Sequence, residues 1–165
     1  MPRFVVTQRF DVPRAILFDV LCRPGNILAA SPPDLGLELL EAPERLGPGV
    51  ITRIRARRWG FATTIETEVI AWEEPVRIVE VQREGVLRAW TLERTWADDA
   101  PGTTLTETID YEPPGGLLGQ LLTAKAIEAD LARAYQRREA WLREKLALGD
   151  SSMVSPGAGD AERPG

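Results

Sequence analysis

The chain has 165 residues, of which 44% are hydrophobic and 27% are charged, and its formal net charge is −5 at pH 7. This is the composition of an ordinary globular protein of one domain. The acidic balance disfavours a nucleic-acid partner, because nucleic-acid binding depends on clustered basic side chains. The chain has no histidine and one cysteine, Cys22, which excludes histidine-based catalytic pairs, histidine zinc sites and an intrachain disulfide.

Targeting and cofactor motifs are not found in the sequence. No apolar run reaches the ~18 residues of a membrane span and no signal segment opens the chain, so we expect a cytoplasmic protein without stable membrane insertion. The acidic pairs lack the spacing of a calcium loop, and no Gly-rich phosphate loop is present. We therefore expect neither a metal site nor a cofactor.

The first 41 residues alternate between strands and short helices. Residues 3–12 are rich in Val, Phe and Thr and predict a first strand. A helix then begins at Pro13, where proline is favoured in the first turn, and a second short helix lies between Pro24 and Pro32. Residues 35–41 predict a second strand, which leads into a loop.

Residues 50–57 and 61–72 predict a hairpin that turns at Trp59 and Gly60. In the register that closes this turn, Thr52 faces Thr67 and Ile54 faces Ile65 on one side of the pair. The reverse side carries charged and polar residues. Such a clean division between faces is typical of a sheet with one solvated side.

Three further strands are predicted at residues 76–83, 87–96 and 104–112, and the last two form a hairpin. In its register Trp96 faces Leu105, and Leu92 faces Ile109. Arg94 lies on this apolar face and is opposite Glu107. We therefore expect an ion pair between Arg94 and Glu107, because an unpaired charge in such a place is very costly.

One long helix is predicted over residues 117–148, since apolar residues recur there at three- and four-residue steps. Beyond it, residues 149–165 are small, polar and rich in proline, and we expect them to be disordered. The sequence thus predicts one domain, residues 1–148, followed by a disordered tail, residues 149–165.

The order of these elements, together with several local motifs, resembles a known family. The motifs are VPRAILFDVL, GPGVITRIR, IAWEEPVRIVEVQ, AWTLERTW and TLTETIDYEPPGGLLGQLL. They resemble the bacterial ligand-binding branch of the SRPBCC superfamily, over residues 3–148. That superfamily includes START-type lipid-transfer domains, plant pathogenesis-related allergens, polyketide cyclase/aromatases and coenzyme Q-binding proteins. Relatives often carry histidines where this chain has Leu92 and Arg94.

The resemblance implies an α+β helix-grip fold, in which a curved antiparallel sheet of about seven strands wraps around the long C-terminal helix. It also implies an internal cavity between the sheet and that helix. Strand residues expected to face the cavity are Ile54, Phe61, Thr63, Ile65, Thr67, Val79, Val81, Trp90, Leu92, Arg94, Glu107, Ile109 and Tyr111. The helix is expected to add Leu121, Ala124, Ile127 and Leu131.

A mostly apolar cavity with a few polar groups suits a small, hydrophobic, partly oxygenated ligand, such as a lipid, a polyketide or a quinone-like molecule. Two interpretations of Arg94 and Glu107 stay open. Either the pair only fixes the strands, with Tyr111 packed on Trp90, or Arg94 orients a ligand oxygen or carboxylate while Glu107 holds its guanidinium.

Three functions are compatible with the sequence, and we favour a non-enzymatic carrier or sensor. The second is a polyketide cyclase/aromatase-like enzyme in which Glu107 or Tyr111 moves protons. Against it, Arg94 is expected to lower the pKa of the facing carboxylate, and histidine is missing. The third is an interaction module with a filled core and no ligand. The oligomeric state is left open.

Overall fold

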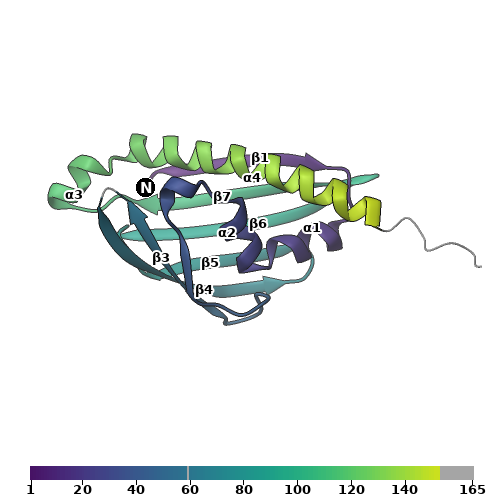
Figure 1. Cartoon of the computed structure of the whole chain (residues 1–165), viewed down its shortest axis with the longest axis horizontal. Helices are drawn as coiled ribbons and strands as arrows, with labels where there is room; N and C mark the ends of the chain where they lie inside the picture. The colour runs from purple at the N-terminus through teal and green to yellow at the C-terminus, as the bar shows by residue number, and fades with distance from the viewer. Residues whose placement is uncertain (59, 153–165) are drawn as a thin grey trace, which may run out of the picture.

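The structure, a computed structural model, describes residues 1–58 and 60–152 (Figure 1). The strands are β1 (Arg3–Phe10), β2 (Glu38–Glu41), β3 (Ile51–Arg58), β4 (Phe61–Glu73), β5 (Arg77–Glu84), β6 (Ala89–Asp99) and β7 (Gly102–Glu112). The helices are α1 (Arg14–Leu21), α2 (Pro24–Ala30), the short 3-10 helix η1 (Pro33–Leu35), α3 (Gly116–Leu121) and α4 (Ala124–Ser152). The predicted tail lies outside the described residues from position 153 onward, and α4 reaches Ser152.

The strands form one antiparallel sheet of seven strands in the order β1-β7-β6-β5-β4-β3-β2. Helix α4 lies along one face of this sheet, and α1 and α2 lie on the same side (Figure 1). The predicted class, an α+β fold with a seven-stranded antiparallel sheet and a long C-terminal helix, is confirmed. No helix in the described part of the chain is both long and apolar enough to cross a membrane.

Two hairpin registers follow the pairing expected from the sequence. Ile54 pairs with Ile65 in β3–β4, and Arg94 pairs with Glu107 in β6–β7. The predicted turn at Trp59 and Gly60 falls partly outside the described residues, because Trp59 is not among them. The confirmed registers place the predicted polar and apolar faces of these four strands correctly.

Strand β5 presents the opposite face from the one expected. Val79 and Val81 were expected to point toward the cavity, but Ile78 pairs with Arg94 and Glu80 pairs with Leu92. Residues paired across two strands share a face, so Glu80 and its alternate neighbours point inward. The outward-facing Val79 is also buried, with 7% of its surface exposed, so apolar character alone does not identify the inward face of β5.

The predicted helix over residues 117–148 is two helices. Helix α3 ends at Leu121, and α4 begins at Ala124. The Thr123 hydroxyl accepts a hydrogen bond of 3.2 Å from the backbone N–H of Ala126, so Thr123 caps α4. Helix α3 leaves three leucines exposed, Leu117 at 80%, Leu118 at 49% and Leu121 at 64%.

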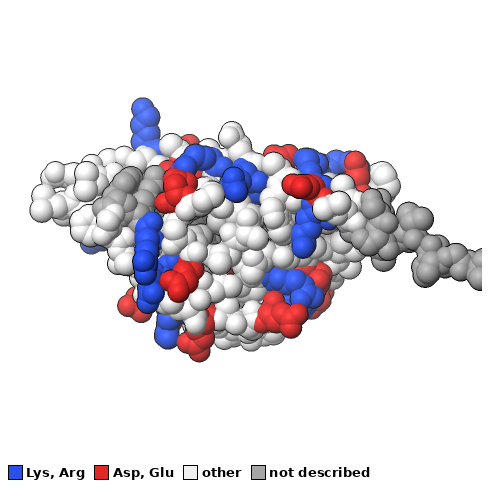
Figure 2. Space-filling model, viewed as in Figure 1, with Lys and Arg blue, Asp and Glu red and all other residues white. Residues whose placement is uncertain are grey.

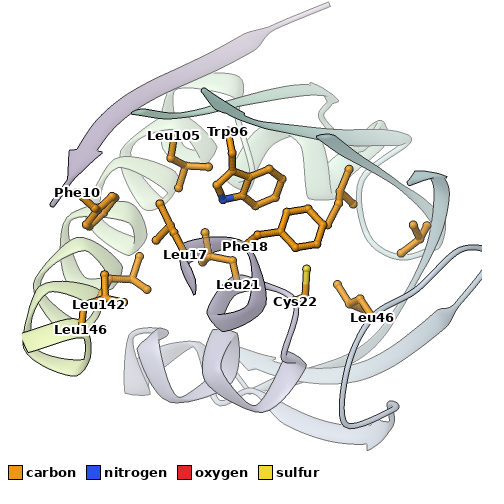
Figure 3. Close-up of a cluster of buried hydrophobic side chains, with 12 residues drawn as sticks. Phe10, Leu17, Phe18, Leu21, Cys22, Leu46, Trp96, Leu105, Leu142 and Leu146 are labelled. Carbon is orange, nitrogen blue, oxygen red and sulfur yellow. The ribbon is translucent and has the colours of Figure 1, made fainter. Parts of the chain in front are cut away.

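The main hydrophobic core lies at one end of the sheet, between α1 and the C-terminal half of α4. Phe18 of α1 packs against Trp96 of β6, with 4.7 Å between ring centroids (Figure 3). Leu17 and Leu21 of α1 point into the same cluster as Leu142 of α4. Each such buried side chain contributes about 1.5–3 kcal/mol. This core anchors α1 and α4 on the sheet and leaves the middle of the sheet to the cavity.

Candidate functional site

A cavity of about 390 Å³ lies between the sheet and helices α2 and α4. Its floor comes from the inward residues of β3 to β7, and its roof from α2 and from Leu131 to Arg138 of α4. The loop before β6 closes one side with Val86 and Leu87. The lining is mainly aliphatic, and its polar members are Ser31, Thr52, Thr67, Glu80, Gln82, Arg94, Tyr135 and Arg138.

Many of the residues predicted from the sequence lie in this wall. The strands place Ile54 and Ile65 from β3 and β4 next to Thr67, and the helix contributes Leu131. The members supplied by β6 and β7 are Trp90, Leu92, Arg94 and Ile109. These positions follow from the two hairpin registers, which put alternate residues on the concave face.

Several expected strand positions lie outside the wall. Phe61 is 69% exposed at the start of β4, because the tip of the β3–β4 hairpin extends beyond the covered part of the sheet. Thr63 is also outside the lining, near the same tip. Val79 and Val81 pair with residues of the outer face of β6, Glu93 and Thr91, so they point away from the cavity.

The helix positions expected at the wall differ because the helix is interrupted. Leu121 belongs to α3 and is 64% exposed. Ala124 and Ile127 occupy the first turns of α4, where Ile127 packs with Leu92 and Ile109 in a second apolar cluster instead of reaching the cavity.

The two residues considered for proton transfer are both engaged elsewhere. Tyr111 is buried, and its hydroxyl donates a hydrogen bond of 3.0 Å to the backbone carbonyl of Ala124. Burial raises the pKa of the Tyr111 hydroxyl. Glu107 is completely enclosed and lies behind Arg94, outside the cavity lining. Neither side chain faces the cavity.

The sequence interpretation left out the wall residues from α2 and the loops, and it also missed four polar residues of β5 and α4. Glu80 and Gln82 were missed because the alternation of β5 was read in the wrong phase. Tyr135 and Arg138 of α4 were missed because only apolar residues were counted in the helix stripe. The signal was present, since Arg138 follows Ala134 by four residues, on the same face of the helix.

Glu80, Arg94, Glu107 and Arg138 form a buried quartet of charges. Arg94 Nε donates to Glu107 Oε1 over 2.8 Å, and Arg94 Nη1 donates to Glu80 Oε1. Arg138 Nη1 donates to the same Glu107 Oε1 over 2.9 Å, and Arg138 Nη2 forms an ion pair with Glu107 Oε2. No member of the quartet has more than 7% of its surface exposed.

The quartet joins three strands to the C-terminal helix. Glu80 comes from β5, Arg94 from β6, Glu107 from β7 and Arg138 from α4. The charges of the two arginines and two glutamates sum to zero, and this balance allows the four groups to be buried. The expected ion pair between Arg94 and Glu107 is present, and it is part of the quartet that also includes Glu80 and Arg138.

Tyr135 of α4 lies beside the quartet and contacts two of its members. Its hydroxyl makes a long hydrogen bond of 3.4 Å to Glu107 Oε1, and the guanidinium carbon of Arg138 lies 4.1 Å from the centre of its ring. Burial raises the pKa of Tyr135 to about 12, so the hydroxyl stays protonated. Burial, with the charge of Arg94, lowers the pKa of Arg138 from its ordinary value.

The remaining reactive groups do not suggest a metal or redox centre. Within residues 1–58 and 60–152, no three cysteine or carboxylate side chains are grouped as metal ligands. Cys22 is buried in the main core, and burial raises the pKa of its thiol to about 12. A protonated, enclosed thiol is a packing element and not a nucleophile.

Comparison with known proteins identifies solved structures that have a similar fold. No family model and no curated protein matches the chain. Among solved structures, protein Ms6760 from Mycobacterium smegmatis is 14% identical with a TM-score of 0.64, over 89% of this chain and 92% of that one. Protein CV1439 from Chromobacterium violaceum is 12% identical with a TM-score of 0.66, over 86% and 96%. Major latex-like protein 151 from Panax ginseng is 15% identical with a TM-score of 0.59, over 84% and 95%.

The architecture is the helix-grip fold. The similarity extends over almost the full length of each neighbour, so the sheet and the long helix correspond as one unit. Identities this low establish the fold alone, and a fold hosts many functions. The function therefore has to be argued from the cavity and the groups that line it.

Proposed function

We propose that the chain binds a small, hydrophobic, partly oxygenated molecule, such as a lipid, a polyketide or a quinone-like compound, in the cavity between the sheet and α4. The observation that carries this proposal is the 390 Å³ cavity, whose wall is aliphatic apart from a few polar groups. Ligand pockets of proteins have volumes of about 300–1,000 Å³ and this kind of lining. The assignment to the ligand-binding branch of the SRPBCC superfamily is part of the proposal and is supported by the sequence motifs.

The volume of the cavity indicates how much of a ligand it can enclose. At the roughly 30 Å³ that one water molecule occupies in the liquid, the space has room for at least about a dozen non-hydrogen atoms. Burying such a molecule removes most of its apolar surface from water, which favours binding by about 25 cal/mol per Å². A medium-length chain or a compact ring system fits this volume.

Native mass spectrometry of the freshly purified protein tests the proposal directly, because a bound small molecule adds its own mass. Ala134→Phe is the matching variant, since Ala134 lines the cavity and a larger side chain there fills it. We expect Ala134→Phe to abolish displacement of an environment-sensitive dye while the helical circular dichroism is retained. Ala129→Phe, at an exposed position of the same helix, is the control and is expected to bind normally. Equal binding by Ala134→Phe and the parent protein would contradict a ligand in this cavity.

The two residues considered for proton transfer in the cyclase-like alternative are both engaged in other contacts. Glu107 is held by two guanidinium groups, and the Tyr111 hydroxyl is bonded to the backbone of α4. The ligand-free interaction module required a filled interior, and a 390 Å³ cavity argues against it. Binding is therefore the function that the site supports best.

A further inference from the structure

We propose that the cavity selects neutral ligands whose polar end both accepts and donates a hydrogen bond, such as a primary amide or a hydroxyl, and that it discriminates against carboxylates. The inference rests on the proposed function and names the chemical class of its ligand. Its basis is the charge balance of the buried quartet and the two polar atoms that the quartet leaves available.

The first step is the charge balance. Arg94 and Arg138 carry two positive charges, and Glu80 and Glu107 carry two negative charges, all of them buried. The nearby Tyr135 hydroxyl is neutral. A carboxylate entering the cavity would add a negative charge with no unused countercharge beside it. Burial of an uncompensated charge is strongly unfavourable, so an anionic ligand loses affinity.

The second step is the hydrogen-bond inventory of Arg94 and Glu80, which both line the cavity. Arg94 uses Nε for Glu107 and Nη1 for Glu80, and within the described residues its Nη2 has no hydrogen-bond partner. Glu80 accepts at Oε1 from Arg94, and its Oε2 has no partner in the same set of residues. Neither atom belongs to the fully enclosed unpartnered atoms of the described chain.

The third step is that Glu107 and Arg138 contribute little to ligand contact. Their polar atoms turn toward each other, and Glu107 Oε2, Arg138 Nε and Arg138 Nη2 are fully enclosed by protein. Among the four residues of the quartet, polar contact with the ligand therefore falls to Arg94 and Glu80. A guanidinium N–H beside a carboxylate oxygen offers one donor and one acceptor, which matches an amide or a hydroxyl.

A matched set of four probes tests this selection: decanamide, 2-undecanone, decanoate and undecane. They share the same chain and differ at the polar end, and each has about as many non-hydrogen atoms as the cavity can enclose. Near pH 7 we expect decanamide to bind at least tenfold more tightly than decanoate in a dye-displacement titration, with 2-undecanone between them. Acidification that protonates decanoate is expected to raise its affinity toward that of the amide.

Two variants change the charge of the cavity wall with little change in side-chain size. Glu80→Gln leaves the quartet with one excess positive charge, so we expect decanoate to gain at least tenfold relative to decanamide. Gln82→Glu adds a carboxylate to the wall outside the quartet, so we expect decanoate to lose affinity relative to decanamide. Glu93→Gln, on the outer face of β6, is the matched control and is expected to change the affinity for neither decanoate nor decanamide.

The outcomes separate this inference from the proposed function. Decanoate binding as tightly as decanamide to the parent protein would overturn the inference, since the anion would then displace Glu80 from Arg94. Equal affinity for decanamide and undecane would also overturn it, while leaving ligand binding in the cavity intact. Failure of all four probes, with no molecule co-purifying in native mass spectrometry, would remove the proposed function itself.

Discussion

Glu107 of β7 and Arg138 of α4 form a buried ion pair that ties the long helix to the middle of the sheet, with Arg138 Nη1 2.9 Å from Glu107 Oε1. Glu107 also accepts from Arg94, so one carboxylate holds two guanidinium groups. The residue that the sequence suggested as a proton donor or acceptor is therefore the link between the sheet and its helix.

Glu107→Gln is expected to destabilise the protein strongly, because it leaves Arg94 and Arg138 with a single carboxylate, Glu80, between them. Breaking a buried ion pair by removing one partner typically loses about 3–5 kcal/mol. Urea unfolding followed by circular dichroism measures the loss. Asp110→Asn is the control on the same strand, since Asp110 pairs with the exposed Arg3 at a similar distance of 2.7 Å. A loss no larger than that of the control would refute the structural role of Glu107.

Arg94→Leu is expected to lower the free energy of unfolding by about as much as Glu107→Gln, because it leaves Glu80 and Glu107 with one cation, Arg138. The double variant Arg94→Leu with Glu80→Leu restores a balanced pair, and we expect it to recover more than half of the lost stability. The double-mutant cycle, measured by urea unfolding, gives the coupling between the two residues. Additive losses would show that Glu80 does not depend on Arg94. The folded double variant also lacks the donor and the acceptor that Arg94 and Glu80 offer to the ligand, so it is expected to bind decanamide no better than undecane.

Thr123→Ala is expected to destabilise the protein by about 1 kcal/mol, because it removes the hydroxyl that caps the N-terminus of α4. Thr123→Ser keeps an oxygen in that place and is expected to stay close to the parent protein. Denaturant midpoints of the three proteins, compared at a constant slope, provide the measurement. If Thr123→Ser and Thr123→Ala lose the same stability, the hydrogen bond of the Thr123 hydroxyl does not stabilise the start of α4.

Alkaline pH is expected to reduce stability between about pH 9 and pH 12. The pKa of Cys22 rises from 9.0 to about 12, and the pKa of Tyr135 rises from 10.0 to about 12, in both cases because of burial. In this range the unfolded chain has released these protons while the folded chain keeps them, so the unfolded state is favoured as pH rises. Below pH 9 neither group contributes to the pH dependence of stability, because both are protonated in the folded and in the unfolded state.

Tyr135→Phe tests the second part of this pH dependence. We expect the variant to lose stability less steeply than the parent protein between pH 10 and pH 12, as followed by urea unfolding at each pH. Identical slopes for the two proteins would mean that Tyr135 does not keep its proton on folding.

The sequence predicted those parts of the fold that depend on direct pairing between neighbouring strands. The β3–β4 and β6–β7 hairpins have short turns, so their registers, and the meeting of Arg94 with Glu107, followed from alternation alone. The same reasoning placed Ile65 and Leu92 in the cavity wall.

What the sequence missed depends on irregularities that alternation does not reveal. The pairing of β4 with β5 shifts between Glu66 and Thr67 and again between Val69 and Ala71, so the phase of β5 cannot be carried over from β4. Arg138 was missed for a different reason. Its spacing from Ala134 puts it on the inward face of the helix, but its burial depends on Glu107, 31 residues earlier, and no local pattern indicates that partner.

The balanced quartet also determines how the interior responds to salt. The fields of two positive and two negative groups in mutual contact cancel within a short distance, so an uncharged molecule approaching the cavity feels no long-range attraction. Electrostatic screening therefore has little effect on its affinity, even as the Debye length falls from about 30 Å at 0.01 M to about 3 Å at 1 M. Entry is governed by the shape of the cavity and by the release of water from it, while the visible face of the protein carries positive and negative side chains close together (Figure 2).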